Sequence, residues 1–527
     1  MSVPAHVISI KPEDVRKPAR LLFNELEANE LIFAVVGPVG SGTTFVADAL
    51  ENLVRKELNA TNIARIKASN IIAEFIGAEE LARLEPNNRL TRARKFQDAG
   101  DELRKQDEAE LAVRISSSIK AARHGFHGGK EAATPVIDEK KAAPTIYIVD
   151  SLKHPTEVEL LRGLYREAFC LIGVVCEERT RLQRLQDEKC KDSTKSQILE
   201  FMARDEDEDL SWGQKVAETF HLADFFVDNT PPRVTQDQVP NPDWVVNDKL
   251  GRLVDILSGK KIVRPEPSET GMFHAKGAQL RSSCLSRQVG AALTDGRGNV
   301  IATGTNEVPM AGGGVYGSGF DKMDGDQFEP DHRCHQTNQY CSNSRTQTKI
   351  VEEVIKAIPQ LAAVVDKADL IKALKKTALG RLLEFSRAVH AEMDALLTAA
   401  RQGACTVGAK LFVTTFPCHY CARHIVTAGV EEVQYIEPYP KSRAFELHSD
   451  AIQQIASGWK SPSKNRNGKV LFRLFTGVAP RLYRRAFMKD RKLKNGVGDM
   501  EIGRPMWTTG LLRESYTSVE NKLEGSP

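Results

Sequence analysis

The chain has 527 residues, of which 27% are charged and 41% hydrophobic, and its formal net charge is +3. This length suggests two to four domains, and the composition is that of an ordinary globular protein. The small net charge argues against a protein that binds nucleic acid over its whole surface. The sequence contains no run of ~18 apolar residues, so no transmembrane helix is predicted. The N-terminus lacks the apolar core of a signal peptide. We therefore expect no membrane contact and a cytoplasmic location.

The first 230 residues alternate between strand-like and helix-like sequence. The apolar run at residues 31–36 predicts a buried parallel strand, and residues 44–58 after it predict a helix. Residues 92–123 are charge-rich and helical in pattern, and residues 125–144 read as a loop. Further strands are predicted at residues 145–149, 170–176 and 223–229. This alternation predicts an α/β domain with a mostly parallel sheet over residues 1–230.

A glycine-rich segment, GPVGSGTT at residues 37–44, follows the first predicted strand. Its candidate phosphate-binding residues are Gly37, Gly40, Ser41, Gly42, Thr43 and Thr44. Backbone N–H groups of such a loop cradle phosphates. However, Thr43 stands where the lysine of a Walker A loop would neutralise the β- and γ-phosphates. We therefore expect nucleotide binding with little or no phosphoryl transfer.

Other residues of this region fit a nucleotide site. Asp150 ends the strand at 145–149 and is a candidate ligand for a nucleotide-bound Mg²⁺. Arg179, Arg181 and Arg184 resemble the arginines of nucleotide kinases, so the region resembles a P-loop kinase-like domain. The alternative is a glycine-rich turn beside a solvated basic helix.

Prolines are frequent at residues 231–270, which we interpret as a linker with one helix at 248–258. A second α/β domain is expected at residues 271–487, followed by a tail at 488–527. Within it, strands at 288–293 and 300–303 flank an Asp-Gly turn and predict a hairpin. Residues 312–345 read as a long inserted loop, and residues 349–400 as largely helical. Two more strands are predicted at residues 410–415 and 433–436.

Nine cysteines, an odd number in a long chain, argue against a disulfide framework. Cys418 and Cys421 form a Cys-x-x-Cys motif after Pro417, and His390-Ala391-Glu392 lies upstream. Catalytic zinc keeps three protein ligands and one open position, and His390, Cys418 and Cys421 supply three. The start of a helix would favour the two thiolates. Glu392 is too close to His390 to be a fourth ligand, but it would reach the bound water as a proton shuttle.

The combined pattern, H-x-E followed by P-C-x-x-C, is the signature of zinc deaminases; Cys-x-x-Cys alone would fit a structural zinc knuckle or a redox pair equally well. In deaminases zinc lowers the pKa of water towards ~7. Hydroxide then attacks C4 of the ring, while Glu392 protonates N3 and the departing ammonia.

The flanking sequence RSSCLSRQVGAALTDGRGNVIATGTNEVP, residues 281–309, resembles the deoxycytidylate deaminase family. The resemblance implies that Asn306 contacts the sugar and that the Ala391 backbone N–H holds the cytosine carbonyl. With residues 437–452, residues 475–487 and the P-loop region, the chain resembles the bacterial anti-phage dCTP deaminases. That resemblance implies a cytidine-deaminase-like α/β/α domain, one catalytic Zn²⁺, and conversion of dCTP and/or dCMP that depletes the dCTP pool. We also expect a nucleotide effector at the P-loop and a homo-oligomer.

Two weaker patterns remain open. The ligand types of His332, Cys334, His335 and Cys341 suit a second, structural zinc, but their spacing matches no standard knuckle and solvated or substrate-gating residues fit as well. Residues 458–494 carry twelve Lys and Arg against one Asp, a net of +11. This segment is a solvated face, or it attracts a triphosphate or an inhibitory RNA. Rival functions are a nucleic-acid cytosine or adenosine deaminase and a nucleotide-sensing P-loop regulator.

Overall fold

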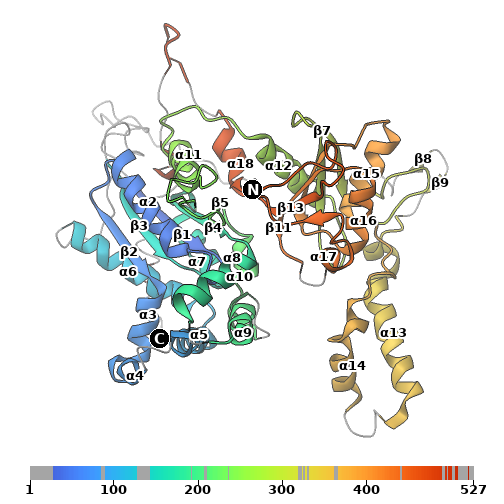
Figure 1. Ribbon diagram of the computed structural model, residues 1–527, viewed down its shortest axis with the longest axis horizontal. Coiled ribbons are helices and arrows are strands. Elements are labelled where there is room, and N and C mark those ends of the chain that lie inside the picture. The colour runs from blue at the N-terminus through green and yellow to red at the C-terminus, as the bar shows by residue number, and fades with distance from the viewer. Residues whose placement is uncertain are drawn as a thin grey trace, which may run out of the picture. The chain divides into compact units, whose positions relative to one another are not determined.

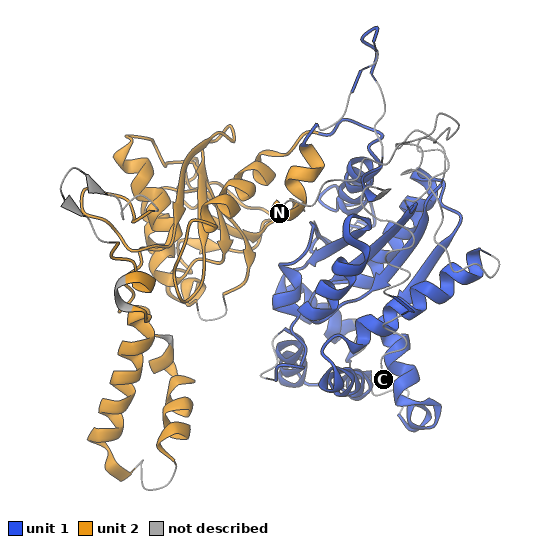
Figure 2. Cartoon of the chain, turned by 180° about the vertical axis from the view of Figure 1, so that it is seen from behind, with its two compact units in different colours: residues 1–263, 488–527 blue, residues 264–487 orange. Residues whose placement is uncertain are grey.

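A computed structural model describes residues 28–84, 89–127, 143–191, 193–206, 210–235, 237–317, 323–324, 327–328, 331–360, 366–439, 442–489, 493–494, 496–500, 505–508 and 520–521. The chain forms two compact units, residues 1–263 with 488–527 (unit 1) and residues 264–487 (unit 2; Figure 2). The segment predicted as a linker, 231–270, is thus divided between the units. In the described part of the chain, no helix is both long and apolar enough to cross a membrane.

Unit 1 is built on a parallel sheet in the order β5-β4-β1-β3-β2 (Figure 1). Its strands are β1 (Glu30–Val36), β2 (Ile63–Lys67), β3 (Thr145–Asp150), β4 (Phe169–Val175) and β5 (Phe225–Asp228). All residues of β1 and β4 are buried, as expected for central strands of a parallel sheet. The parallel α/β prediction for this region is confirmed.

Helices cover the sheet of unit 1: α2 packs on β1 and β3, α11 packs on α2, and α6 packs on α7. The helices are α2 (Thr43–Glu57), α3 (Ala68–Ile76), α4 (Ala78–Arg83), α5 (Arg89–Gln106), α6 (Glu110–Phe126), α7 (Pro155–Tyr165), α8 (Glu178–Arg184), α9 (Lys195–Glu206), α10 (Val216–Phe220) and α11 (Val246–Ser258). The predicted loop at residues 125–144 lies mostly outside the described residues.

The C-terminal segment is grouped with unit 1, and two contacts explain why. Trp507, which is buried, donates a hydrogen bond from Nε1 to Asn29 Oδ1 at 2.9 Å. The Glu520 carboxylate lies 2.7 Å from Arg123 Nη1 and accepts a hydrogen bond from the Tyr165 hydroxyl at 2.6 Å. A buried carboxylate is stable only when paired in this way, so these side chains hold the segment to unit 1.

Unit 2 contains a mixed sheet in the order β12-β13-β11-β10-β6-β7. The first four of these strands are parallel, and β6 and β7 form an antiparallel hairpin, which confirms the predicted hairpin. The strands are β6 (Gly290–Thr294), β7 (Val300–Thr305), β10 (Lys410–Thr415), β11 (Glu432–Glu437), β12 (Ile452–Gln453) and β13 (Val470–Leu474). The short strands β8 (Met323–Asp324) and β9 (Gln327–Phe328) pair with each other, and a further short strand is β14 (Gly477–Val478).

Alternation along β10 separates the two faces of this sheet. Leu411 and Val413 belong to the core cluster that includes Ala395 and Cys421, whereas Phe412 faces Gly271 of α12. Helices therefore cover both faces, as expected for an α/β/α unit. The helices are α12 (Pro267–Gln279), α13 (Ser342–Ala357), α14 (Lys367–Lys375), α15 (Ala391–Arg401), α16 (His419–Thr427), α17 (Ala444–Leu447) and α18 (Pro480–Phe487). Helices α13 and α14 form a pair that projects from unit 2 (Figure 1).

Candidate metal centre and glycine-rich loop

Two helix N-termini bring the predicted metal ligands together. His390 is the residue before α15, and Cys418 is the residue before α16, with Cys421 in the first turn of α16. The sequence places Cys418 three residues after β10, so the strand fixes where α16 begins. Helices α15 and α16 also pack on each other. The positive ends of both helix dipoles thus point to one place and favour thiolate charge there.

The ligand atoms have the spacing that zinc requires. His390 Nδ1 lies 3.3 Å from Cys418 Sγ and 3.3 Å from Cys421 Sγ. Tetrahedral zinc with the usual Zn–S and Zn–N bond lengths would separate a sulfur from a nitrogen ligand by about 3.6 Å. Small rotamer adjustments cover this difference. Among the described residues, these three side chains are the single group of three or more potential metal ligands within 4.8 Å of one another.

The two cysteine thiols differ in pKa. The pKa of the Cys418 thiol is lowered, chiefly by its hydrogen bond with Cys421 and then by His390, although burial opposes the shift. The pKa of Cys421 is raised well above its usual value by the same contact and by burial. Without a cation the pair therefore shares one proton, which zinc binding would displace, as it does at other thiolate sites.

Glu392 lies beside this centre and is buried, with 3% of its surface exposed. Burial raises the pKa of Glu392 to about 7; the charge of His390 opposes this shift and that of Cys418 adds to it. It is not one of the three grouped ligands. A carboxyl group with a pKa near neutrality is suited to accept and return a proton at physiological pH.

The two residues expected to hold substrate differ in the hydrogen bonds that they already make within the chain. Ala391 is the first residue of α15, where the backbone N–H has no partner within the helix. Asn306 is buried and binds its own chain: its Oδ1 accepts from Val289 N and its Nδ2 donates to Arg287 O, both at 2.6 Å. An amide has further capacity for hydrogen bonds, so this arrangement is compatible with a contact to substrate.

Sequence reasoning assigned no role to two further side chains near the centre. Arg287 lies 3.6 Å from Glu437 at the end of β11, and its side chain is half exposed. Tyr439 is partly buried, and its pKa is raised by burial and by the charge of Cys418, which places the ring within electrostatic reach of the site. Arg287 lies inside the segment that carries the family resemblance, but nothing in its spacing singles it out.

The other predicted metal and partner residues are not gathered in this way. No three of His332, Cys334, His335 and Cys341, all of which are described, come within the 4.8 Å that defines the first site. Asp150, the candidate Mg²⁺ ligand, pairs with Arg65 at 3.0 Å, so its charge is already balanced. In the basic segment 458–494, Arg473 pairs with Glu432 at 2.6 Å and Lys469 donates to Ser449 O at 2.6 Å.

The glycine-rich loop runs from β1 to α2, as predicted. Gly40 and Gly42 have φ values of 83° and 84°, a region that glycine adopts without strain. Asn229 Nδ2 donates to Ser41 O at 2.9 Å, and Val39 N donates to Asp205 Oδ2 at 2.7 Å. The loop leaves β1 next to β3 and β4, where the strand order reverses; ligands of open α/β sheets bind at such positions.

The fold of unit 2, the His-Cys-Cys ligand set and the buried glutamate define a zinc-dependent deaminase-type site. Residues 265–437 match the family described as "Cytidine and deoxycytidylate deaminase zinc-binding region". That region is therefore similar to the zinc-binding region of cytidine and deoxycytidylate deaminases.

Individual proteins are similar to parts of the chain. The chain is 27% identical over 163 residues to a deoxycytidylate deaminase of Enterobacteria phage T2, which covers 31% of this chain and 75% of that protein. It is 43% identical over 74 residues to ComE operon protein 2 of Bacillus subtilis, 13% of this chain and 39% of that protein. A solved dCMP deaminase from cyanophage S-TIM5 aligns with 40% of this chain and 100% of its own at 20% identity, with a TM-score of 0.21.

Proposed function

We propose that this protein hydrolyses the exocyclic amino group of deoxycytidine nucleotides, dCMP and/or dCTP, to give the uracil nucleotide and ammonia. The observation that carries the proposal is the convergence of His390, Cys418 and Cys421 beside the buried Glu392. In the reaction the C4–N4 bond breaks and a C4–O bond forms, with water as the source of oxygen.

Each protein group has one task in this proposal. His390, Cys418 and Cys421 would hold zinc, which when bound acts as a Lewis acid and makes water a nucleophile near neutral pH. Glu392 takes the proton released from water and delivers protons to ring N3 and to the leaving amine. The pKa of about 7 lets this one carboxyl group act in both directions. The N–H of Ala391, at the start of α15, holds the base carbonyl, and Asn306 contacts the sugar.

A free nucleotide is the proposed substrate, by the resemblance to the deoxycytidylate deaminase family. Arg287 is half exposed, and its backbone carbonyl accepts a hydrogen bond from Asn306, the proposed sugar contact. Guanidinium groups bind phosphates through charge-assisted hydrogen bonds. We propose Arg287 as the phosphate contact. Depletion of the dCTP pool as an anti-phage defence is the biological role we propose for this activity, by the resemblance to anti-phage deaminases.

The test compares substrates with one enzyme preparation. Purified protein is incubated with dCMP, dCTP, CTP and a single-stranded cytosine-containing oligonucleotide, and uracil formation is followed. Faster conversion of dCMP or dCTP than of the oligonucleotide is expected. Preferred conversion of the oligonucleotide would favour the rival nucleic-acid deaminase, and no conversion of any substrate by zinc-loaded protein would contradict an enzymatic role.

We propose a second function for unit 1, the binding of nucleotide phosphates at residues 37–44 without phosphoryl transfer. The supporting observation is that the amide of Val39 already binds an anionic group, the Asp205 carboxylate. The ligand would act as an effector of the deaminase. An inhibitory RNA at residues 458–494, assembly into a homo-oligomer and a cytoplasmic location also stand as proposals.

A further inference from the structure

The glycine-rich loop binds a carboxylate from the chain itself. Asp205 lies in the last turn of α9, and only 2% of its surface is exposed. Its Oδ2 accepts the hydrogen bond from Val39 N at 2.7 Å, and its Oδ1 lies 2.8 Å from Lys153 Nζ. The carboxylate thus receives an N–H of the loop and a lysine ammonium, the two kinds of partner that a phosphate receives in such loops.

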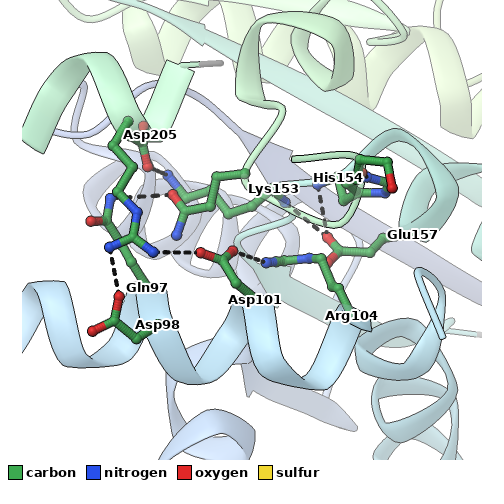
Figure 3. Close-up of polar contacts among 11 residues, drawn as sticks. Gln97, Asp98, Asp101, Arg104, Lys153, His154, Glu157 and Asp205 are labelled. Carbon is green, nitrogen blue, oxygen red and sulfur yellow. Dashed lines mark hydrogen bonds and ion pairs between the residues drawn. The ribbon is translucent and has the colours of Figure 1, made fainter. Parts of the chain in front are cut away.

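Lys153 places a cation beside the loop, whose own sequence has Thr43 where a Walker A loop has lysine. Its Nζ also donates to the carbonyl of Gly37, the first residue of the loop, at 3.3 Å. Glu157 fixes the lysine backbone: its Oε2 accepts from Lys153 N at 2.8 Å, and its Oε1 accepts from the buried Arg104 at 2.8 Å. Figure 3 shows Lys153 between Asp205 on one side and Glu157 on the other. The lysine is therefore positioned from the end of β3, and not from the loop.

A second pair repeats the arrangement. Arg181 is 95% buried; its Nη2 lies 2.6 Å from Glu206, the last residue of α9, and its Nη1 donates to Val39 O at 3.4 Å. Its Nε has no hydrogen-bond partner within the described residues. A Cβ built on Gly42 would come within 3.8 Å of Arg184 Nη1. Three cationic side chains therefore surround the loop, and the end of α9 neutralises two of them.

A buried hydroxyl inside the loop is also without a partner. Ser41 is fully buried, and no hydrogen-bond partner of its Oγ is found in the described part of the protein. The hydroxyl turns across the loop, because a Cβ built on Gly37 would lie 2.5 Å from it. An unsatisfied buried hydroxyl costs stability unless a ligand or water satisfies it. This observation points to a ligand independently of the helix N-terminus.

We propose that residues 37–44, Lys153 and Arg181 form a site for the polyphosphate of a nucleoside triphosphate, and that Asp205 and Glu206 occupy this site as internal competitors. The inference rests on the phosphate binding proposed above for unit 1, and adds that α9 must withdraw its two carboxylates before a ligand enters. Withdrawal frees two cations for the ligand. Two carboxylates left in place would repel a polyphosphate, since like charges strongly disfavour each other at short range in a partly buried site.

The test measures binding of inorganic tripolyphosphate and of ATP, each with Mg²⁺, to the full-length protein by titration calorimetry. Asp205→Asn keeps the size of the side chain and an acceptor for Val39 N, but removes the charge. We expect Asp205→Asn to bind both probes at least about tenfold more tightly than the unmodified protein. Lys153→Met in the Asp205→Asn background should reverse the gain, because it removes the cation that the phosphates would receive.

Glu200→Gln is the matched control, because it removes a carboxylate from the same helix. Glu200 is exposed and pairs with Arg94 at 2.8 Å on the surface. Its substitution should leave affinity unchanged. Glu206→Gln is the second test variant, and it should also tighten binding. It replaces Asp205→Asn if thermal unfolding and zinc content show that Asp205→Asn does not fold.

The outcomes separate the two proposals. Equal affinity of Asp205→Asn, Glu206→Gln and the unmodified protein would overturn the internal competition but leave phosphate binding intact. Absence of binding to every variant would overturn both. If Glu200→Gln increased the affinity for the probes as much as Asp205→Asn, the effect would be one of general charge, and this result would also overturn the proposed internal competition.

Discussion

Gly304→Ala should inactivate the metal centre through the contact between β7 and α15. A Cβ built on Gly304 would lie 2.1 Å from Ala391 O and 2.3 Å from Ala395 N. Both are backbone atoms of α15, so no side-chain rotation relieves the overlap. Ordinary Cβ contacts begin near 3.4 Å, so α15 would have to move by about 1.3 Å, the difference between 3.4 and 2.1 Å.

That movement is large on the scale of catalysis. Helix α15 carries Glu392 and follows His390 directly. Metal–ligand distances tolerate about 0.2 Å, and a displacement near 1 Å typically costs about 100-fold in rate. We therefore expect kcat to fall about 100-fold and zinc occupancy to decrease. Overpacking should also cost roughly 1–3 kcal/mol of stability, or about 2–12 °C in Tm for a unit of this size.

The assay follows deamination of dCMP, bound zinc and thermal unfolding in parallel. Gly296→Ala is the control, because Gly296 lies in the turn between β6 and β7 and a Cβ there meets nothing within 4 Å. It should match the unmodified protein in all three readouts. Normal turnover and Tm in Gly304→Ala would refute the argument that close packing of α15 on β7 positions the centre.

Three further predictions test the neighbouring assignments. Elemental analysis should give one zinc per chain, lost in Cys418→Ala; two zinc ions, one of which survives this change, would place a second metal elsewhere. Arg287→Gln should raise KM for dCMP about tenfold with kcat nearly unchanged, because a phosphate contact made equally in ground and transition states contributes uniform binding. The KM for deoxycytidine, which has no phosphate, should be the same in the variant and the unmodified protein. Glu157→Gln should cost about 3–5 kcal/mol, since it breaks a buried pair in which Arg104 is 1% exposed; the exposed Glu159→Gln on the same helix should cost less than ~0.5 kcal/mol in chemical denaturation.

The metal centre was predictable because its signals are local. A histidine and a Cys-x-x-Cys at two helix starts need only short-range geometry, and α16 begins at the Cys-x-x-Cys as predicted. Residues 349–400, predicted as largely helical, are instead divided among α13, α14 and α15, and α15 begins only at Ala391. The apolar runs at β1 and β4 were equally informative, since a fully buried parallel strand must be apolar throughout. In the same way, the Asp-Gly turn identified the hairpin of β6 and β7.

Contacts between residues far apart in sequence were not predictable. Lys153 and Asp205 are 52 positions apart, and neither stands in a motif. The attachment of the C-terminal segment depends on Glu520 meeting Arg123, a separation of 397 positions. The sequence suggested a linker at residues 231–270 from its prolines, but α11 buries an apolar face against α2 and belongs to unit 1.

The most direct test of the account is the activity of Glu392→Gln measured together with its zinc content. Gln keeps the size of the side chain but removes the titratable carboxyl group. His390, Cys418 and Cys421 remain, so the variant should retain zinc and still bind dCMP, while turnover falls by ~100- to 10,000-fold. His390→Ala should lose both zinc and activity. Loss of zinc from Glu392→Gln to the extent seen in His390→Ala, or near-normal turnover of dCMP by Glu392→Gln, would contradict the role of Glu392 as the proton shuttle of a zinc-dependent deaminase.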